Sequence, residues 1–288
     1  MLSADEYRHM RKIALSMSNS DQQIPTDLLT DSSKFTFDAI ISLRNQLVVR
    51  KLKKESYLID RMMNDIKNRV LTNGESLQSI AHSLSFSSYK LAKSFLELYL
   101  NRQITISSFM EDPTIVSDIH LREDILNCIS EDLVCSLEST LIAECYGREY
   151  ENVLVEHLKR LHLCFETEQE LRSKGRSKTP DALFLIPMAT STESSGTELS
   201  VVNWIDSKAL FADDETFLEN LAQFKAYNNR YGKGLVIYWF GFSESVLEII
   251  RREDLGLAVS CRFPDHWVFP TGEVATVETP PSFCRPIS

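Results

Sequence analysis

The sequence is organised around two short stretches, Lys178-Thr179-Pro180-Asp181 and Trp204-Ile205-Asp206-Ser207-Lys208. The first stretch precedes an apolar run from Ala182 to Met188, and the second closes an apolar run that begins at Leu199. Both runs have the length and composition of strands, and a polar loop separates them. Because side chains alternate along a strand, Asp206 and Lys208 are expected on one face. We therefore predict two neighbouring strands that bring two carboxylates and one amine together.

This arrangement is similar to the P-D…(D/E)-x-K pattern of a large superfamily of nucleases. The pattern contains few residues, so the prediction depends on their order and on their positions in two strands. The alternative for Asp206 and Lys208 is an ion pair at the exposed end of a strand. The pattern predicts Asp181, Asp206 and Lys208 as catalytic residues.

A third carboxylate is expected from the helix predicted over residues 149–161. Glu151, Leu154, Leu158 and Leu161 fall on one face of that helix, and Glu149 falls outside it. A carboxylate that faces a core is unfavourable unless it is paired or binds a metal ion. The alternative is that Glu151 lies exposed in the first helical turn, where the helix dipole stabilises it. We favour Glu151 as a site residue because Asp181 and Asp206 follow it in the order that the pattern requires.

Three carboxylates at one place repel each other and raise each other's pKa, and a bound cation removes that conflict. Mg²⁺ and Mn²⁺ prefer oxygen ligands, which Glu151, Asp181 and Asp206 would supply. Such a cation polarises a phosphate group and generates hydroxide from water. Lys208 would position the attacking water and offset charge on the phosphate. We therefore expect a Mg²⁺ or Mn²⁺ site in this half of the chain.

The pattern after residue 148 alternates between helix and strand. Gln223 and Tyr227, four positions apart on a predicted helix, form an adjacent polar pair. The run from Leu235 to Phe240 is apolar throughout, as in a strand that is buried on both faces. The remaining predicted elements are a strand at 162–166, helices at 215–229 and 244–252, and a last strand at 255–263.

The first 145 residues predict helices. We expect helices at 3–17 (capped by Ser3 with Glu6), 26–29, from a cap at Ser32 or Ser33 onward, 56–70 and 118–143. Residues 75–100 predict a helix, a short turn and a second helix, which is a helix-turn-helix candidate. The second helix offers Lys90 and Lys93 but no Arg, so DNA contact and plain three-helix packing both remain open. The basic cluster Arg50, Lys51, Lys53 and Lys54 is either a solvated helix end or a phosphate-contacting patch.

Composition narrows the class of protein. The 288 residues are 43% hydrophobic and carry a net charge of −10, which argues against coating nucleic acid by bulk charge. Residues 1–100 hold 14 basic and 11 acidic side chains, and residues 101–288 hold 17 and 30. Divalent cations bound there would reverse the negative electrostatic field that the acidic residues of 101–288 produce. The six cysteines form no Cys-x-x-Cys pair, and no apolar run reaches membrane-spanning length. We expect an intracellular protein of the nucleus and cytoplasm, without a zinc site and without membrane contact.

Longer blocks resemble one family more closely. They are Glu168-x-x-Leu171-Arg172-x-Lys174-Gly175-x-x-Lys178-Thr179-Pro180-Asp181, Trp204-Ile205-Asp206-Ser207-Lys208-Ala209, and Asn229-Arg230-Tyr231-Gly232-x-Gly234-Leu235-Val236-Ile237-Tyr238-Trp239-x-Gly241-Phe242. Over residues 148–242 the chain resembles the codanin-interacting nuclease family, also called the TPD family, of the PD-(D/E)xK superfamily. Departures are Asp206 in place of Glu, Ala212 in place of Gly, the insert 189–199 and the Pro-rich tail.

The resemblance implies a fold, a site and partners. It implies metal and catalytic roles for Glu151, Asp181, Asp206 and Lys208, and codanin as a protein partner. Gln223 and Tyr227 are similar to the Gln-x-x-x-Tyr motif of RecB-like nucleases, which implies contact with the substrate strand. Lys178, Lys90 and Lys93 are the basic residues that we expect at the substrate.

We therefore expect a helical, helix-turn-helix-like domain at 1–145, a restriction-endonuclease-like α/β domain with a central mixed sheet at 146–268, and a flexible tail at 269–288. The expected function is a metal-dependent nuclease that acts on DNA rather than RNA. The alternative is a nuclease-fold interaction protein, weakly catalytic or non-catalytic, that binds codanin. A helix-turn-helix regulator is a third reading, which predicts duplex binding by residues 1–110 alone.

Overall fold

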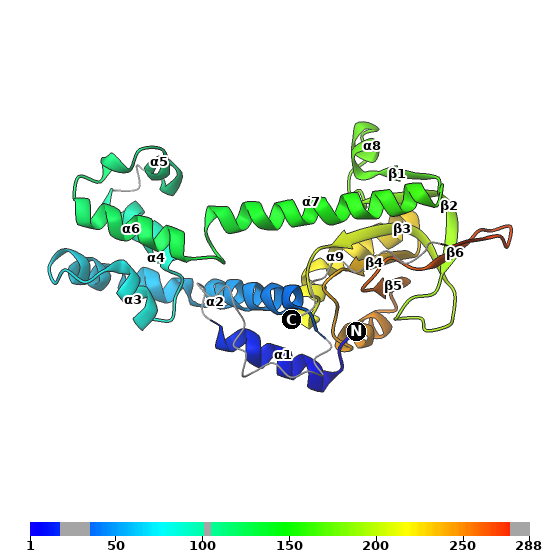
Figure 1. The fold of residues 1–288 in the computed structure, drawn as a ribbon, viewed down its shortest axis with the longest axis horizontal. Coiled ribbons are helices and arrows are strands. Elements are labelled where there is room, and N and C mark those ends of the chain that lie inside the picture. The colour runs from blue at the N-terminus through cyan, green and yellow to red at the C-terminus, as the bar shows by residue number, and fades with distance from the viewer. Residues whose placement is uncertain (18–34, 101–104, 277–288) are drawn as a thin grey trace. The chain divides into compact units, whose positions relative to one another are not determined.

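The computed structural model describes residues 1–17, 35–100 and 105–276, and they divide into two compact units. The first unit comprises Met1–Ala14, Pro25–Arg44 and Glu144–Ser288, and the second comprises Leu15–Ile24 and Asn45–Ala143. Most of the elements of each unit are labelled in Figure 1.

The second unit is helical, as expected. Its helices are most of α2 (Phe37–Leu71), α3 (Leu77–Ser83), α4 (Ser88–Tyr99), α5 (Ile106–Glu111), the 3-10 turn η2 (Pro113–Ile115), α6 (Ile119–Glu131) and the start of α7 (Leu137–Arg160). The side chains of Ser76 and Ser87 cap α3 and α4, and the predicted helix, turn and helix are present. Apolar residues of α2, α3, α4 and α6, among them Ile66, Ile80, Phe95 and Ile125, form one core.

Three helix boundaries were predicted wrongly. The helix expected at 149–161 begins at Leu137 and passes through Gly147 without a break, as α7. The helix expected at 56–70 is the second half of α2, because the stretch 50–55 contains no Gly or Pro and Lys51 lies 3.9 Å from Glu55 one turn later. The helix expected at 118–143 is broken after Glu131, because the side chain of Asp132 accepts hydrogen bonds from the N–H groups of Val134 and Cys135 and so forms a turn. The helix at 26–29 and the caps at Ser32 and Ser33 lie outside the described residues.

The first unit contains a seven-stranded mixed sheet with the order β5-β4-β3-β2-β6-β7, and β1 pairs with β2. The central pair β2 (Ala182–Thr190) and β3 (Ser200–Lys208) is antiparallel, as the two apolar runs predicted. Strands β3, β4 (Gly234–Tyr238) and β5 (Leu257–Ser260) are parallel. The remaining strands are β1 (Phe165–Thr167), β6 (His266–Val268) and β7 (Val274–Thr276).

Helices cover both faces of this sheet (Figure 1). On one face, Tyr150, Leu154 and Leu158 of α7 pack against Ile205 and Ile237. On the other face, α9 (Asp214–Tyr231) and α10 (Ser245–Arg252) pack against residues that include Trp204 and Val236. Most of helix α1 (Ala4–Ser16) also belongs to this unit, and Ser3 and Glu6 form the predicted cap. The short helix α8 (Glu168–Ser173) lies between β1 and β2.

The predicted last strand is not the last, because β6 and β7 follow β5 and extend the sheet next to β2. Strand β7 falls within the stretch 269–288 that we expected to be a tail, and residues 277–288 lie outside the described part. The insert after β2 is anchored to the end of β5, where Glu193 accepts a hydrogen bond of 2.5 Å from Ser260. Among the described helices, none is both long and apolar enough to cross a membrane.

Candidate active site

Asp206 and Lys208 form a buried ion pair on the central strand β3. Lys208 Nζ lies 2.5 Å from Asp206 Oδ2, and the two side chains are 19% and 2% exposed. This burial excludes the alternative of an exposed pair at a strand end. Burial by itself lowers the pKa of Lys208, but the charge of Asp206 and the hydrogen bond to it outweigh this effect and raise that pKa. Lys208 therefore carries a proton, and it is the cation on which this site depends.

Asp181 meets the pair at the start of β2. Its Oδ2 accepts a hydrogen bond of 2.6 Å from the backbone N–H of Ser207, the residue between Asp206 and Lys208. Burial, and after it the charge of Asp206, raises the pKa of Asp181 well above its ordinary value. The pKa of Asp206 is also raised by burial, which Lys208 opposes. One charged amine thus stands beside two carboxylates, the buried one of Asp206 and the half-buried one of Asp181, so negative charge outnumbers positive charge among these three groups when both carboxylates are ionised.

Glu151 approaches the same group from α7. It is partly exposed, and burial, followed by the charge of Glu168, raises its pKa; the charge of Lys208 opposes this rise and the charge of Asp206 adds to it. Glu149 is exposed and lies outside the core-facing stripe of α7. Glu151 rather than Glu149 thus lies on the more buried side of α7, as the helical spacing predicted.

Glu168 is a fourth carboxylate, which the sequence analysis did not assign to the site. Its backbone N–H donates to the carbonyl of Asp181 over 3.2 Å, and its Oε1 accepts from Thr179 Oγ1 over 3.2 Å. Arg172 holds the same Oε1 at 2.6 Å. The charge of Glu168 raises the pKa of Glu151 and of Asp206. Its signal in the sequence is its place at the start of the block that ends in Thr179-Pro180-Asp181, which hydrophobic periodicity does not reveal.

The described residues contain no group of three or more His, Cys, Asp and Glu side chains that could together hold a metal ion. The pair of Asp181 and Asp206 nevertheless fits a hard cation. Apart from its ion pair with Lys208, the buried Oδ2 of Asp206 has no hydrogen-bond partner. Mg²⁺ is usually bound by one or two carboxylates, with water and substrate phosphates completing its shell. Two aspartates short of positive charge match that requirement.

Gln223 and Tyr227 are adjacent on α9, as predicted, and they reach the Thr-Pro-Asp segment. Gln223 Nε2 donates to the hydroxyl of Tyr227 over 2.7 Å, and that hydroxyl donates to the carbonyl of Thr179 over 2.8 Å. Tyr227 is 3% exposed, and burial, followed by the charge of Asp206, raises its pKa to about 12. The pair of Gln223 and Tyr227 therefore contacts the chain two residues before Asp181.

The basic residues expected at the substrate belong to different units. Lys178 is exposed beside Asp181, with its backbone in the left-handed region at a φ of 57°. Lys90 and Lys93 belong to α4 of the second unit, where Lys90 lies over the ring of Tyr89 at 5.8 Å. Only Lys178 is thus placed at the candidate site within its own unit.

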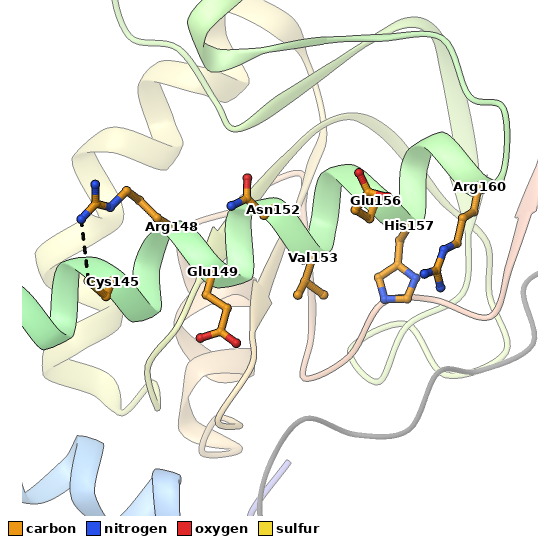
Figure 2. Close-up of a pocket in the computed structure, with 8 residues that line it drawn as sticks. All are labelled: Cys145, Arg148, Glu149, Asn152, Val153, Glu156, His157 and Arg160. Carbon is orange, nitrogen blue, oxygen red and sulfur yellow. Dashed lines mark hydrogen bonds between the residues drawn. The ribbon is translucent and has the colours of Figure 1, made fainter.

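A separate groove of about 490 Å³ runs along α7, as Figure 2 shows. Its lining residues are Cys145, Arg148, Glu149, Asn152, Val153, Glu156, His157 and Arg160. His157 stacks on Phe263 with ring centroids 4.7 Å apart, and burial, followed by the charge of Arg160, lowers its pKa. The groove contains none of the expected catalytic residues.

Comparison with known proteins gives one family. A family model described as "Protein of unknown function TPD sequence-motif" matches residues 117–257. The chain is 33% identical to "CDAN1-interacting nuclease 1" of Xenopus tropicalis over 202 residues, which cover 67% of this chain and 63% of that protein. It is 31% identical to the Homo sapiens protein of the same name over 213 residues, covering 70% and 72%. The chain thus spans slightly less than two thirds of the Xenopus tropicalis relative. No solved structure matches.

Proposed function

Because the chain belongs to the family of the CDAN1-interacting nucleases, we propose that it is a nuclease that hydrolyses phosphodiester bonds, with DNA as its substrate and Mg²⁺ or Mn²⁺ as its cofactor. The observation that carries this proposal is the buried pair of Asp206 and Lys208 with Asp181 bound to the backbone between them. Two carboxylates and one charged amine on adjacent strands are the groups that metal-assisted hydrolysis of a phosphodiester needs.

Asp181 and Asp206 would hold the cation, and Glu151 would complete its surroundings from α7. When bound, the cation polarises the scissile phosphate and lowers the pKa of a water molecule. Asp181 is kept in place by Ser207, so its carboxylate stays fixed relative to β3. The protonated amine of Lys208 would orient the attacking water and offset negative charge that develops on the phosphate.

The topology supports assignment to the PD-(D/E)xK fold. Asp181 precedes β2, Asp206 and Lys208 end the antiparallel neighbour β3, and the parallel strand β4 follows after helix α9. In the proposed complex the exposed Lys178, which lies in the segment that leads to Asp181, contacts the substrate. The helical unit would add Lys90 and Lys93 as contacts to the sugar-phosphate backbone.

The proposal is tested with the full chain and end-labelled single-stranded DNA, duplex DNA, branched DNA and RNA, each with Mg²⁺, with Mn²⁺ and with a chelator. We expect cleavage that depends on the cation and is lost in Asp181→Asn and Lys208→Ala. The matched control is Lys225→Ala, which removes an amine from an exposed ion pair with Glu253 on the same unit and should cleave normally. Cleavage that persists in Asp181→Asn or Lys208→Ala would refute the site.

A second function is favoured by exposed apolar side chains at the start of α7. Leu137, Leu141 and Ile142 are 44%, 59% and 49% exposed, which is unusual for neighbouring large aliphatic residues. Such a surface suits a protein partner, and the name of the relatives points to codanin. Under this alternative the chain binds a codanin-like protein and cleaves weakly or not at all. Loss of that binding in Leu141→Glu, together with no cleavage of any substrate by the wild-type chain, would favour it.

A further inference from the structure

The segment from Ser177 to Asp181 has to hold a catalytic carboxylate without the help of regular structure. It belongs to neither a helix nor a strand. Pro180 has no N–H group to donate, and Lys178 has a φ of 57°, a region that residues other than Gly rarely adopt. A segment of this kind keeps one conformation only if neighbouring elements fix it.

Helix α9 supplies one set of these contacts. The hydroxyl of Tyr227 donates to the carbonyl of Thr179 over 2.8 Å, and Arg230 Nη1 donates to the carbonyl of Ser177 over 2.7 Å. A tyrosine hydroxyl has one proton, and here that proton is used on Thr179. Gln223 Nε2 donates to the oxygen of the same hydroxyl over 2.7 Å, which fixes the direction of the hydrogen bond.

The opposite side of the segment is fixed by α8 and β3. Glu168 accepts a hydrogen bond from the side chain of Thr179 and donates its backbone N–H to the carbonyl of Asp181. The Asp181 carboxylate is then bound by the N–H of Ser207. Thr179 is 5% exposed and is held through both its carbonyl and its hydroxyl. The position of Asp181 thus follows from the position of Thr179, two residues earlier.

We propose that Gln223 and Tyr227 are positioning residues, which hold the carbonyl of Thr179 and thereby place the Asp181 carboxylate against β3, rather than residues that contact nucleic acid. The role as positioning residues for a catalytic carboxylate rests on the nuclease function proposed above. The hydrogen bonds that hold residues 177–181 are present whether or not the chain cleaves nucleic acid. Tyr227 is 3% exposed, and its hydroxyl is occupied both as donor and as acceptor. To contact a substrate, it would first have to release Thr179.

The test compares the wild-type full chain with Tyr227→Phe, which removes one hydroxyl and keeps the ring. The matched control is Tyr7→Phe, since the Tyr7 hydroxyl donates to Asp213 over 3.1 Å at the other end of α9. Two readouts are used, namely hydrogen exchange of peptides that span residues 177–184 and the midpoint of a Mg²⁺ titration followed by the melting temperature. In Tyr227→Phe we expect exchange about fivefold faster and a midpoint about five- to tenfold higher, as for the loss of one buried hydrogen bond. Tyr7→Phe should leave both unchanged.

A kinetic readout separates positioning from substrate contact. With a DNA that the wild-type chain cleaves, we expect kcat to fall roughly 10- to 100-fold in Tyr227→Phe, since misplacing a reacting group by about 1 Å has effects of that size. The Kd for the same DNA, measured with a chelator present, should change less than about twofold, because no contact to the substrate is lost. A weaker Kd with unchanged kcat, exchange and Mg²⁺ midpoint would overturn the proposal.

Two further outcomes are decided by the same design. If Tyr227→Phe does not fold, Gln223→Leu takes its place, because it removes the donor to the Tyr227 hydroxyl and should shift both readouts in the same direction. If the wild-type chain neither binds Mg²⁺ nor cleaves nucleic acid, the proposed function fails. Hydrogen exchange at residues 177–184 then still decides whether Tyr227 restrains the segment, and unchanged exchange refutes that restraint.

Discussion

The replacement of Lys208 by Met tests the electrostatic account of the site most directly. Met keeps the length and the apolar stem of the side chain but removes the charge that lies 2.5 Å from Asp206. At that distance and an effective dielectric constant of about 20, the Coulomb attraction between unit charges is about 7 kcal/mol. Desolvation of both groups offsets part of it. Removing one partner of a buried pair typically costs about 3–5 kcal/mol, because the remaining charge stays buried without a partner.

The loss should depend on pH with a defined sign. In Lys208→Met the pKa of Asp206, which burial already raises, rises further because its cation is gone. A carboxyl group with a raised pKa in the folded state stabilises the fold in its protonated form. That contribution is complete below the unfolded pKa of about 4 and is lost as the pH rises through the folded value. The difference from wild type should therefore be small near pH 4 and approach about 3–5 kcal/mol in mildly alkaline solution.

Urea unfolding followed by tryptophan fluorescence measures this difference. Trp204, Trp239 and Trp267 all lie in the first unit, so the signal reports unfolding of the unit that contains the site. Lys225→Met is the control, because the ion pair of Lys225 with Glu253 has a similar distance of 2.7 Å but side chains that are 45% and 27% exposed. Its loss should cost less than about 1 kcal/mol at every pH. An equally small or pH-independent loss in Lys208→Met would show that water screens the pair of Asp206 and Lys208, and the reasoning would fail.

Three further substitutions have defined directions. Asp181→Asn keeps the acceptor for Ser207 and removes one of two neighbouring negative charges. Because the pKa of Asp181 is raised, wild-type stability declines as the pH rises, so the melting temperature of the variant should exceed that of wild type at pH 8 and equal it at pH 4, and the variant should be inactive. Tyr238→Phe removes a buried hydroxyl that has no hydrogen-bond partner, so the free energy of unfolding in urea should be unchanged or increase by up to about 1 kcal/mol. A clear decrease would mean that the hydroxyl has a partner. Gly234→Ala places a Cβ 2.0 Å from Trp204 Cε2 and should cost about 3 kcal/mol or more in urea, whereas a neutral result would mean that Trp204 can move.

Local pattern predicted much of the fold. The apolar runs at 182–188 and 199–205 gave the paired strands β2 and β3, although both strands are longer than the runs. The spacing of Gln223 and Tyr227 gave their contact on α9. The breaks between helices were less predictable. The end of α6 depends on the side chain of Asp132, whose competition with the helix cannot be seen in hydrophobic spacing.

The sequence by itself determined which residues stand together on an element. Period two put Asp206 and Lys208 on one face of a strand, and period 3.6 put Glu151 on the buried side of a helix while Glu149 was left outside. The sequence also determined the family, because the blocks that contain Thr179-Pro180-Asp181 and Asp206-Ser207-Lys208 can be recognised from their residue types alone.

Only the tertiary structure decided how these elements meet. The antiparallel register of β2 and β3 brings Asp181 to the N–H of Ser207, and the docking of α9 brings Tyr227 to Thr179. Glu168 joins the group only through the turn that packs α8 beside Asp181. Burial made the ion pair of Asp206 and Lys208 a strong one, and burial is a property of the assembled sheet and helices. Asp181 and Ser207 are 26 positions apart in the sequence, and Thr179 and Tyr227 are 48 positions apart, so no local period in the chain encodes these contacts.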